Sequence, residues 1–311
     1  MDYYKIQMKA KSPFSELFTA DQIWGQIVWA ISDMKGTQRA DSFVKEFLDS
    51  PPFLLSMMMP EGLLPIPILP PVLRDVSEGD NKAESEARKR TKKNKKCKWL
   101  TLEQFLQLQS NSSCFAEMDL DLRFQHIPGQ TQETKVSIDR FTNSQIDGSL
   151  HSLTYEFSDC PFVIYLAIDP ERPDILEELG PILDFLSKVG IGGDRSVGRG
   201  IFDMKMVQVS DTEQSLFSFD QVNTFMTLSR CFGRDLVPLS YRVSAYSGIV
   251  GRSLEGRGNV QLFNKKPILG YDEGSVFSAG RGGLATGIHP DPRVCSYGYA
   301  FPIPIRLEES R

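Results

Sequence analysis

The most unusual chemistry in this sequence lies in a short glycine-rich stretch, GIGGDRSVGRGIF, at residues 190–202. Five of its thirteen residues are glycine, and Arg195 and Arg199 stand among them. Accessible backbone N–H groups, two guanidinium groups and the Ser196 hydroxyl are donors that suit the phosphates of a single RNA strand. The alternative interpretation is a tight turn that carries two exposed arginines.

The same stretch does not match the loops that bind nucleotide cofactors. Dinucleotide and Walker loops follow a strand and open a helix, so that the phosphate meets the positive end of the helix. Here a helical pattern precedes the glycines and a strand pattern follows them, and the chain has no Gly-Lys-Ser/Thr sequence. We therefore expect no nucleotide cofactor.

Metal-independent RNA cleavage is the competing chemistry, and it requires a general base close to a general acid. The chain has three histidines, His126, His151 and His289, and no two of them are near in sequence. A single histidine in a loop is more often a surface residue than a catalytic one. We therefore predict no catalytic residue, with an endoribonuclease that uses His151 or His289 as the alternative.

Neither carboxylates nor cysteines indicate a metal site. The acidic pairs Asp119 with Asp121 and Asp272 with Glu273 have no supporting histidine or cysteine, and we interpret them as solvated acids. The five cysteines are scattered and form no C-x-x-C pair. This usage argues against zinc and against a disulfide framework, and it favours a reducing cytoplasm. We predict no metal and no cofactor.

The net charge of −5 hides a strongly basic segment, since residues 82–98 carry nine Lys or Arg. This segment could bind RNA, or it could be a solvated charged face. No run approaches 18 consecutive apolar residues, and the first residues lack the apolar core of a signal peptide. We therefore expect a cytoplasmic protein that has no membrane partner.

Hydrophobic periodicity predicts the elements that must position the glycine-rich stretch. Thr19 and Gln22 have the spacing of a capping box at a helix start, and Gly36 is a plausible stop for that helix. The order of elements is that of a β-α-β-β-α-β ferredoxin-like domain with a long insertion. The predicted elements are strands at 5–11, 162–168 and 201–209 and helices at 19–35, 40–50 and 174–189.

The other segments are assigned from composition. Residues 134–157 predict two strands joined by a polar turn, and residues 99–109 predict a helix. The proline-rich residues 51–75 predict an extended segment on a domain surface, and residues 210–220 predict a polar connector. Strand patterns separated by glycine-rich loops then predict a mostly-β second half.

Four stretches resemble the RAMP (repeat-associated mysterious protein) subunits of type III, Csm-type, CRISPR effector complexes, in particular the fourth Csm subunit. The glycine-rich stretch is the most specific of them, with its Gly-Gly-x-Arg-Ser core and its Gly-x-Gly-x-Phe exit. The other three are FTADQIWGQIVWAI, VSIDRFTNSQIDGSLHSLTYEF, and YRVSAYSGIVGRS followed by GSVFSAG. Together the four stretches span almost the whole chain.

The resemblance implies an α+β fold of two ferredoxin-like (RRM-like) domains, the second of them degenerate and mostly β. The expected boundaries are 1–209 and 210–311, with an insertion at about 51–130 and a projecting hairpin at about 135–157. The implied role is a non-catalytic subunit that caps the 5′ handle of the guide RNA (crRNA). The implied partners are the crRNA, the large palm-domain subunit, the adjacent backbone RAMP subunit and target RNA near the 5′ end of the guide.

The predicted RNA-binding residues combine the glycine-rich stretch with positions carried over from the other three stretches. Replacing the two arginines of the glycine-rich stretch is expected to weaken RNA retention, and the hairpin is expected to touch RNA. The predicted set is Gly190, Gly192, Gly193, Arg195, Ser196, Gly198, Arg199, Thr19, Asp21, Arg140, Phe141, Asn143, His151, Ser247 and Gly248.

Overall fold

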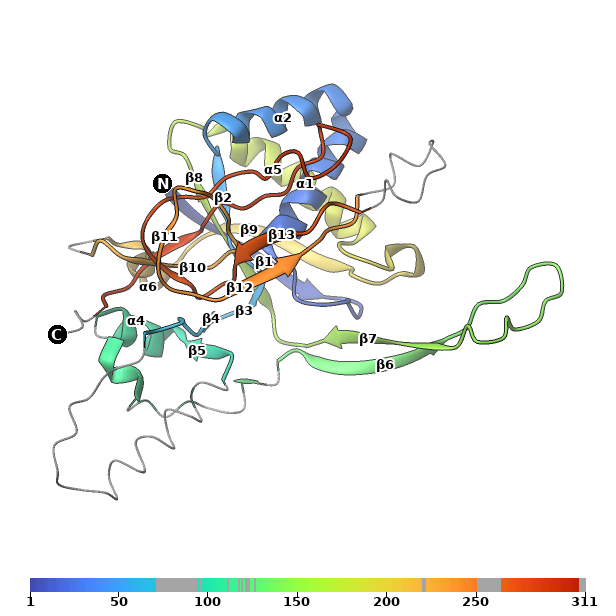
Figure 1. Ribbon diagram of the computed structural model, residues 1–311, viewed down its shortest axis with the longest axis horizontal. Helices are drawn as coiled ribbons and strands as arrows, with labels where there is room; N and C mark the ends of the chain where they lie inside the picture. Colours follow the sequence, from blue (N-terminus) through green and yellow to red (C-terminus); the bar gives the residue numbers. More distant parts are fainter. Residues whose placement is uncertain are drawn as a thin grey trace, which may run out of the picture.

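An antiparallel sheet of the N-terminal half lies at the centre of the computed structural model (Figure 1). Its strands run in the order β2-β8-β1-β9, and the short strand β3 also pairs with β8. The strands are β1 (Asp2–Ala10), β2 (Phe53–Leu55), β3 (Met59–Pro60), β8 (Phe162–Ile168) and β9 (Phe202–Gln208). The structure describes residues 1–70, 94, 97–110, 112–116, 118, 120, 124–125, 127–219, 222–250 and 264–307.

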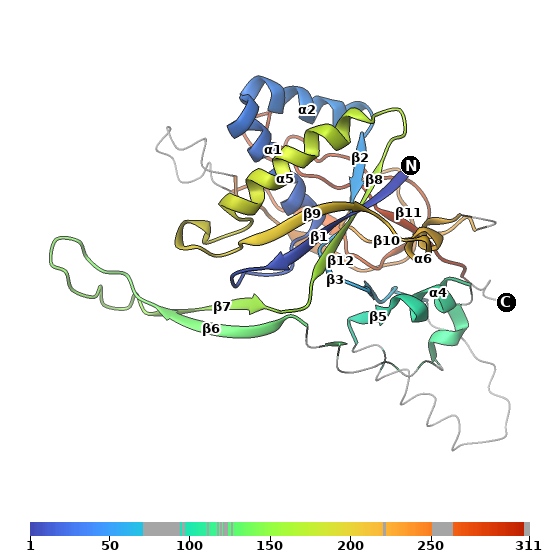
Figure 2. The same cartoon turned by 180° about the vertical axis from the view of Figure 1, so that it is seen from behind.

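Three helices lie on one side of this sheet (Figures 1 and 2). They are α1 (Ala20–Lys35), α2 (Thr37–Asp49) and α5 (Asp174–Val189). The α1 helix follows β1, and α5 follows β8 and leads to β9, so the strands and helices predicted at these positions are confirmed, whereas the remaining strands of the sheet, β2 and β3, lie in a segment that was not predicted to form strands. Every residue of β8 is buried, because the helices cover one face of the sheet and aromatic side chains of the C-terminal half pack on the other.

The start and the end of α1 lie where the sequence predicts them. The Gln22 side chain accepts a hydrogen bond from the Thr19 backbone N–H at 2.9 Å, which satisfies a donor that the helix leaves unpaired. At the other end Gly36 has a φ of 87°, and its N–H returns to the Ser32 carbonyl at 3.0 Å. The residues that predict the two ends of α1 therefore act through hydrogen bonds at the ends of the helix itself.

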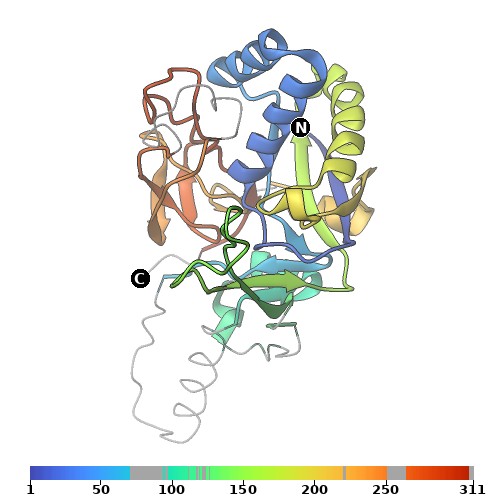
Figure 3. The same ribbon diagram turned by 90° about the vertical axis from the view of Figure 1, so that its right-hand side faces the viewer.

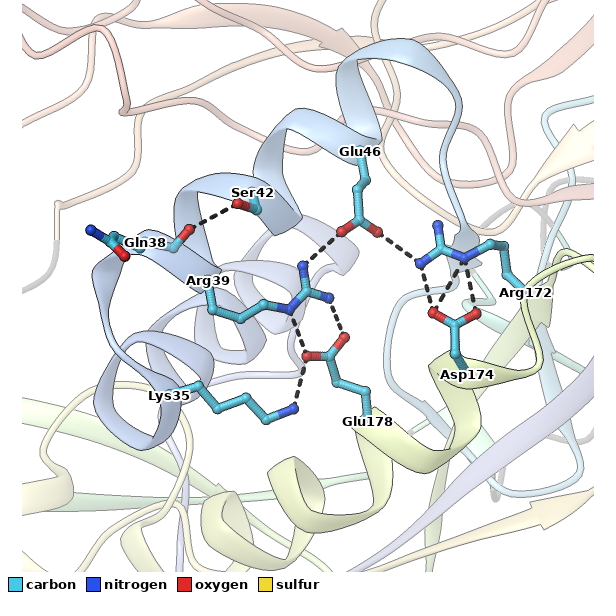
Figure 4. Close-up of polar contacts among 8 residues, drawn as sticks. All are labelled: Lys35, Gln38, Arg39, Ser42, Glu46, Arg172, Asp174 and Glu178. Atoms are coloured by element: carbon cyan, nitrogen blue, oxygen red, sulfur yellow. Dashed lines mark hydrogen bonds and ion pairs between the residues drawn. The ribbon is translucent and has the colours of Figure 1, made fainter.

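Ion pairs join the outer surfaces of the three helices (Figure 4). Arg39 of α2 pairs with Glu178 of α5 and, at 2.7 Å, with Glu46 two turns further along α2. Lys35 at the end of α1 reaches Glu178 at 2.9 Å, and Arg172 reaches Glu46 at 2.9 Å. The network connects α1, α2 and the start of α5 through side chains that are partly shielded from water.

The proline-rich segment corrects one expectation. Residues 51–65 do not lie on a domain surface, because nearly all of them are buried and β2 and β3 extend the central sheet. Two further elements follow from this segment: β4 (Leu63–Pro65) pairs with β5 (Trp99–Thr101). The predicted helix at 99–109 is therefore a short strand followed by α4 (Leu102–Ser110) and the 3₁₀ turn η1 (Ser112–Ala116).

A two-stranded arm extends away from the body (Figures 1 and 2). It consists of β6 (Gly129–Lys135) and β7 (His151–Phe157), paired in register from Gly129 with Phe157 to Lys135 with His151. No residue of the connecting loop 136–150 is buried. Phe14 and Glu156 exchange backbone hydrogen bonds at the root of the arm, and Cys160, which lies near it, is exposed, whereas the other four cysteines are buried or half-buried.

The C-terminal half is mostly β, as predicted. A four-stranded sheet has the order β11-β14-β10-β15, and β12 pairs with β13 in a separate ribbon. The elements are β10 (Phe225–Thr227), β11 (Val237–Ser240), β12 (Val243–Tyr246), β13 (Ile268–Tyr271), β14 (Val276–Ala279) and β15 (Pro302–Pro304).

The predicted polar connector at 210–220 is instead a packed element. It forms α6 (Asp211–Gln214) and the 3₁₀ turn η4 (Ser215–Phe217), in which Glu213 and Leu216 are buried. Glu213 accepts hydrogen bonds from Lys5 of β1 at 2.8 Å and from the Tyr165 hydroxyl of β8 at 3.0 Å. The central sheet thus holds α6 by a buried charge pair.

The two halves lie side by side and share one hydrophobic core (Figure 3). The Tyr297 hydroxyl accepts a hydrogen bond from the Leu55 backbone N–H at 3.0 Å, and its ring lies 6.1 Å from that of Trp24 in α1. Because the two halves share this core, the division into two domains at residues 209/210 stays a prediction. Among the residues that the structure describes, no helix is long and apolar enough to cross a bilayer.

Candidate RNA-binding site

The glycine-rich loop, residues 190–200, connects α5 to β9, and two of its glycines are required by the protein itself. Gly192 has a φ of 87°, and a Cβ there would lie 2.6 Å from the ring of Phe18. Gly200 has a φ of 69°, and its Cβ would lie 2.0 Å from the Ile191 carbonyl oxygen. Internal packing accounts for these two positions. A Cβ on Gly193, by contrast, would meet nothing within 4 Å.

The middle of this loop presents backbone donors to solvent. Asp194 has a left-handed φ of 58°, and residues 195–197 form the 3₁₀ turn η3 (Arg195–Val197). The N–H groups of Val197 and Gly198 bond back to the Asp194 and Arg195 carbonyls. Among the described residues, the N–H groups of the five residues 192–196 donate no hydrogen bond, and residues 193–198 are exposed. Successive N–H groups beside a left-handed residue form a concave anion site, or nest.

The two arginines of the loop differ in their contacts. Arg195 is exposed, and its Nη1 donates to the Gln26 side chain of α1 at 3.1 Å. Arg199 is half-buried, pairs with Glu133 of β6, and lies with its Cζ 4.8 Å from the centre of the Tyr155 ring. Arg195 is therefore available to a phosphate, whereas Arg199 holds the loop against the arm.

Asp194 is the second link between the loop and the arm. The Tyr155 hydroxyl donates to its carboxylate at 2.6 Å, and the Lys135 ammonium lies 3.3 Å from the same oxygen. The hydrogen bond from Tyr155, aided by Lys135, holds the pKa of Asp194 below its usual range. Glu133, Lys135 and Tyr155 were not predicted to belong to the site, because no pattern relates them to a loop about 40 to 60 residues further along.

The structure brings the predicted residues at the start of α1 close to those of the C-terminal half. The Thr19 hydroxyl donates to Asp21 at 2.6 Å. Burial raises the pKa of Tyr246 and the Asp21 carboxylate adds to this rise, while burial lowers the pKa of Lys265 against smaller opposing effects of Cys295 and Asp21. Exposed Ser247 follows Tyr246, and the Gly248 carbonyl accepts from the Lys265 N–H at 2.9 Å.

The remaining predicted residues lie on the arm, away from this junction. Arg140, Phe141 and Asn143 belong to the connecting loop, where the Phe141 side chain is wholly exposed and Asn143 has a left-handed φ of 52°. His151 opens β7, is exposed, and contacts the Ser149 carbonyl through Nδ1 at 2.9 Å. The candidate site therefore has two parts, the junction around α1 and the arm tip.

Two expectations about titratable groups are wrong. Asp272 and Glu273 are not solvated acids, because both are partly buried and burial raises the pKa of Glu273. His289 is not a surface histidine: it is buried, and its Nδ1 accepts from the Asp291 N–H at 3.0 Å.

No group of three His, Cys, Asp or Glu side chains could hold a metal ion within the part of the chain that the structure describes. Several predicted features lie outside that part. They are Asp119, Asp121, His126 and, apart from Lys98, every Lys and Arg of the basic residues 82–98.

Comparison with known proteins supports the predicted RAMP resemblance. The RAMP superfamily pattern matches residues 73–203, which include the arm, α5 and the glycine-rich loop. The chain is also 25% identical over 320 residues to the CRISPR system protein Csm4 of Thermococcus onnurineus (strain NA1), covering 99% of this chain and 98% of that one. The chain therefore resembles the RAMP superfamily in its middle part and Csm4 over almost its whole length.

Solved structures share the fold of this chain. A chain in the crystal structure of a Csm1-Csm4 cassette with pppApA matches with a TM-score of 0.65 and 18% identity, covering 100% of both chains. A chain in the Csm3-Csm4 subcomplex of a type III-A interference complex matches with a TM-score of 0.65 and 14% identity, covering 99% of this chain and 100% of that one. The predicted RAMP resemblance is thus confirmed, and the chain has the mixed α/β fold of these proteins.

Proposed function

We propose that this chain is a non-catalytic RNA-binding subunit of a type III CRISPR effector. In this role it holds the 5′ handle of the crRNA and joins the large palm-domain subunit to the backbone RAMP subunits in antiviral defence. The similar solved structures pair Csm4 with Csm1 in one case and with Csm3 in the other, which supports a place between two such subunits.

The observation that carries the proposal is the donor set of the glycine-rich loop. The N–H groups of the five residues 192–196, which have no acceptor among the described residues, stand beside the exposed guanidinium of Arg195. Backbone N–H groups and arginine are the groups that position a nucleic acid through its phosphates, without reading its sequence. The loop joins the arm to α1, so a strand bound there would pass between the two parts of the candidate site.

The wholly exposed Phe141 supports an RNA contact at the arm tip. Single-stranded bases stack on aromatic side chains, and the neighbouring Arg140 supplies a cation for the backbone. We propose that the tip touches crRNA or target RNA near the 5′ end of the guide.

The fold proposal that accompanies this function is two ferredoxin-like domains, at 1–209 and 210–311. The antiparallel order β2-β8-β1-β9 with α1 and α5 on one side supports the first domain. Within the described part of the second half no long helix accompanies the four-stranded sheet, which is why we describe the second domain as degenerate.

A salt titration tests the RNA contact of the loop. Replacing Arg195 with Gln removes one phosphate contact and is expected to lower the slope of log affinity against log salt by about 0.7. The matched control is Lys45→Gln, which removes one charge from exposed Lys45 of α2. A slope that is identical in the two variants would contradict the placement of RNA at the loop. A wild-type chain that retains no guide RNA would contradict the function.

A cleavage assay tests the non-catalytic assignment. His151 is exposed on the arm, whereas His289 is buried in the C-terminal half, so the two rings occupy unlike environments that do not suggest an acid–base pair. Purified protein incubated with repeat RNA in the absence of metal is expected to leave it intact. Cleavage that is lost in His151→Ala or His289→Ala would instead establish the endoribonuclease alternative.

A further inference from the structure

The glycine-rich loop carries an acid at its centre, Asp194, where a loop that holds phosphates is expected to avoid a carboxylate. Asp194 follows two glycines and precedes Arg195, and its own N–H is one of the five that have no acceptor among the described residues. A phosphate at these donors would stand close to the carboxylate and be repelled by it. The contacts of Asp194 with the arm explain how the loop contains this repulsion.

Two crossed ion pairs join the loop to one side of the arm. Glu133, Lys135 and Tyr155 point to the same side of the arm by the strand register. The Lys135 ammonium of the arm lies 3.3 Å from the Asp194 carboxylate of the loop, while the Arg199 guanidinium of the loop pairs with Glu133 of the arm. We call the pairs Lys135–Asp194 and Glu133–Arg199 the clasp.

The two cations of the clasp lie close together. The Lys135 Nζ and the Arg199 Cζ are 5.1 Å and 4.8 Å from the centre of the same Tyr155 ring. The pKa of Asp194 is lowered first by the hydrogen bond from Tyr155 and then by Lys135 and Arg199, so this carboxylate lies within range of both cations. Two neighbouring positive charges require an anion beside them, and in the free protein Asp194 and Glu133 provide it.

The same pair of cations has the chemistry of a phosphate site. Arginine offers a fork of donors that matches phosphate oxygens, and lysine acts on phosphate as a point charge. The site is also within reach of a ligand, because the Lys135, Glu133 and Arg199 side chains remain 31%, 35% and 22% exposed. Breaking an ion pair this accessible to water changes an equilibrium constant by at most about fivefold. A phosphate that also gains the neighbouring N–H groups can therefore displace the carboxylates.

We infer that Lys135 and Arg199 form a second phosphate subsite beside the glycine-rich loop, and that Asp194 and Glu133 occupy it in the free protein in place of the phosphate. The ligand is a phosphodiester group of single-stranded RNA, which exchanges with the carboxylates as it binds. The inference rests on the proposed function, because it takes RNA to be present at the loop. Its consequence is that RNA binding opens the clasp, while the backbone hydrogen bonds between Phe14 and Glu156 still hold the root of the arm.

A double-mutant cycle tests this exchange through the affinity of the full-length chain for guide RNA that carries its 5′ handle. Asp194→Asn removes the charge, keeps an oxygen that can accept from Tyr155, and introduces a residue type that tolerates a left-handed φ. It is expected to raise RNA affinity. Because the carboxylate must leave Lys135 before the phosphate binds, the gain is expected to be about two- to fivefold larger in the wild-type background than in Lys135→Gln.

Equal gains in the two backgrounds overturn the inference, since they indicate simple repulsion between Asp194 and RNA without any exchange at Lys135. The matched control is Asp174→Asn, which removes a carboxylate paired with Arg172 at 2.8 Å at the far end of α5. Because that end lies beyond the screening length of about 10 Å, this variant is expected to change RNA affinity by less than about twofold.

Glu133→Gln provides an independent test that leaves the loop sequence unchanged. It releases Arg199 and is expected to raise RNA affinity as well. A fall in affinity in both Glu133→Gln and Asp194→Asn would show that the clasp only positions the loop, and would overturn the inference. A wild-type chain that retains no guide RNA refutes the proposed function together with this inference, whereas RNA retention with equal gains in the cycle refutes the inference alone.

Discussion

Gly200 and Gly193 illustrate how residues of the same type serve different purposes in one loop. Gly200 has a φ of 69° and no room for a Cβ, whereas Gly193 faces open space. Gly200→Ala is therefore expected to lower the free energy of unfolding by about 1–3 kcal/mol or more, and Gly193→Ala to change it by less than about 0.5 kcal/mol. Denaturant unfolding of both variants measures this difference. Equal losses would contradict the internal role of Gly200.

Tyr155 connects the arm to the loop through one hydroxyl. Tyr155→Phe keeps the buried ring beneath Arg199 and removes only its hydroxyl, which donates to Asp194 and accepts from Lys135. The loop is then expected to lose its fixed position, so that RNA retention falls severalfold while the fold persists. A filter-binding titration measures the change, and Tyr4→Phe in β1 is the matched control. Unchanged retention would show that the link does not order the loop.

Among the elements, α6 depends on a buried charge. Although burial alone raises the pKa of Glu213, its contacts with Lys5 and Ser210 bring that pKa below its usual value. Glu213→Ala removes the main partner of the Lys5 ammonium and is expected to cost about 3 kcal/mol of stability. Asp211→Ala, at an exposed position in the same helix, is expected to cost less than about 0.5 kcal/mol. Thermal unfolding of both variants tests this contrast.

The ion pairs between α1, α2 and α5 predict an acid-dependent loss of stability. Burial alone raises the pKa of Glu178, but hydrogen bonds from Arg39 and Lys35 outweigh burial, so the pKa in the folded protein is lowered. A lowered pKa contributes stability above the unfolded pKa of about 4.3, and this contribution disappears as the pH falls through the folded value.

Glu178→Gln is accordingly expected to cost about 1–2 kcal/mol at pH 7 and progressively less below about pH 4. Urea unfolding of wild type and variant across this range provides the measurement, with Glu177→Gln at the exposed neighbouring position as the control. A difference that is constant with pH would contradict the assigned role of the carboxylate.

The elements also show what a sequence can and cannot reveal. The α1 helix and the β8 strand were predictable because their signals are local: a capping residue, a helical period, a continuous apolar run. The β2 and β3 strands were misassigned because proline density hid their pairing with β8, which lies about 110 residues away. The α6 helix was missed because its polar composition gave no sign that Lys5 would bury Glu213.

The residues of the candidate site likewise divide into those that a local stretch of sequence predicts and those that only the tertiary structure reveals. The glycines and Arg195 were predictable from one stretch of sequence, and the packing role of Gly192 and Gly200 was not. The contacts of Arg199 with Glu133 and Tyr155 depend on how the arm leaves the body, which is a tertiary property. RNA binding at these residues stays a prediction.

At the scale of the whole molecule, the arm and the body are separable. Residues 136–150 contain no buried side chain, and the arm is held at its root by Phe14, Asp194 and Arg199. Replacing residues 137–149 by Asn-Gly is expected to change the melting temperature by less than about 2 °C, because no core is removed. The shortened arm is expected to disturb guide–target pairing near the 5′ end, which a target-binding assay on the assembled effector measures. Unfolding of this variant would contradict the separation.

The single exposed cysteine of the chain allows a probe to be attached at the root of the arm. Cys160 lies in the link between β7 and β8, while Cys97, Cys231 and Cys295 are buried and Cys114 is half-buried. A maleimide fluorophore therefore reacts first at Cys160 in the unaltered protein. Its anisotropy reports whether the arm moves when RNA or a subunit arrives, so each ligand can be followed in real time without an engineered cysteine.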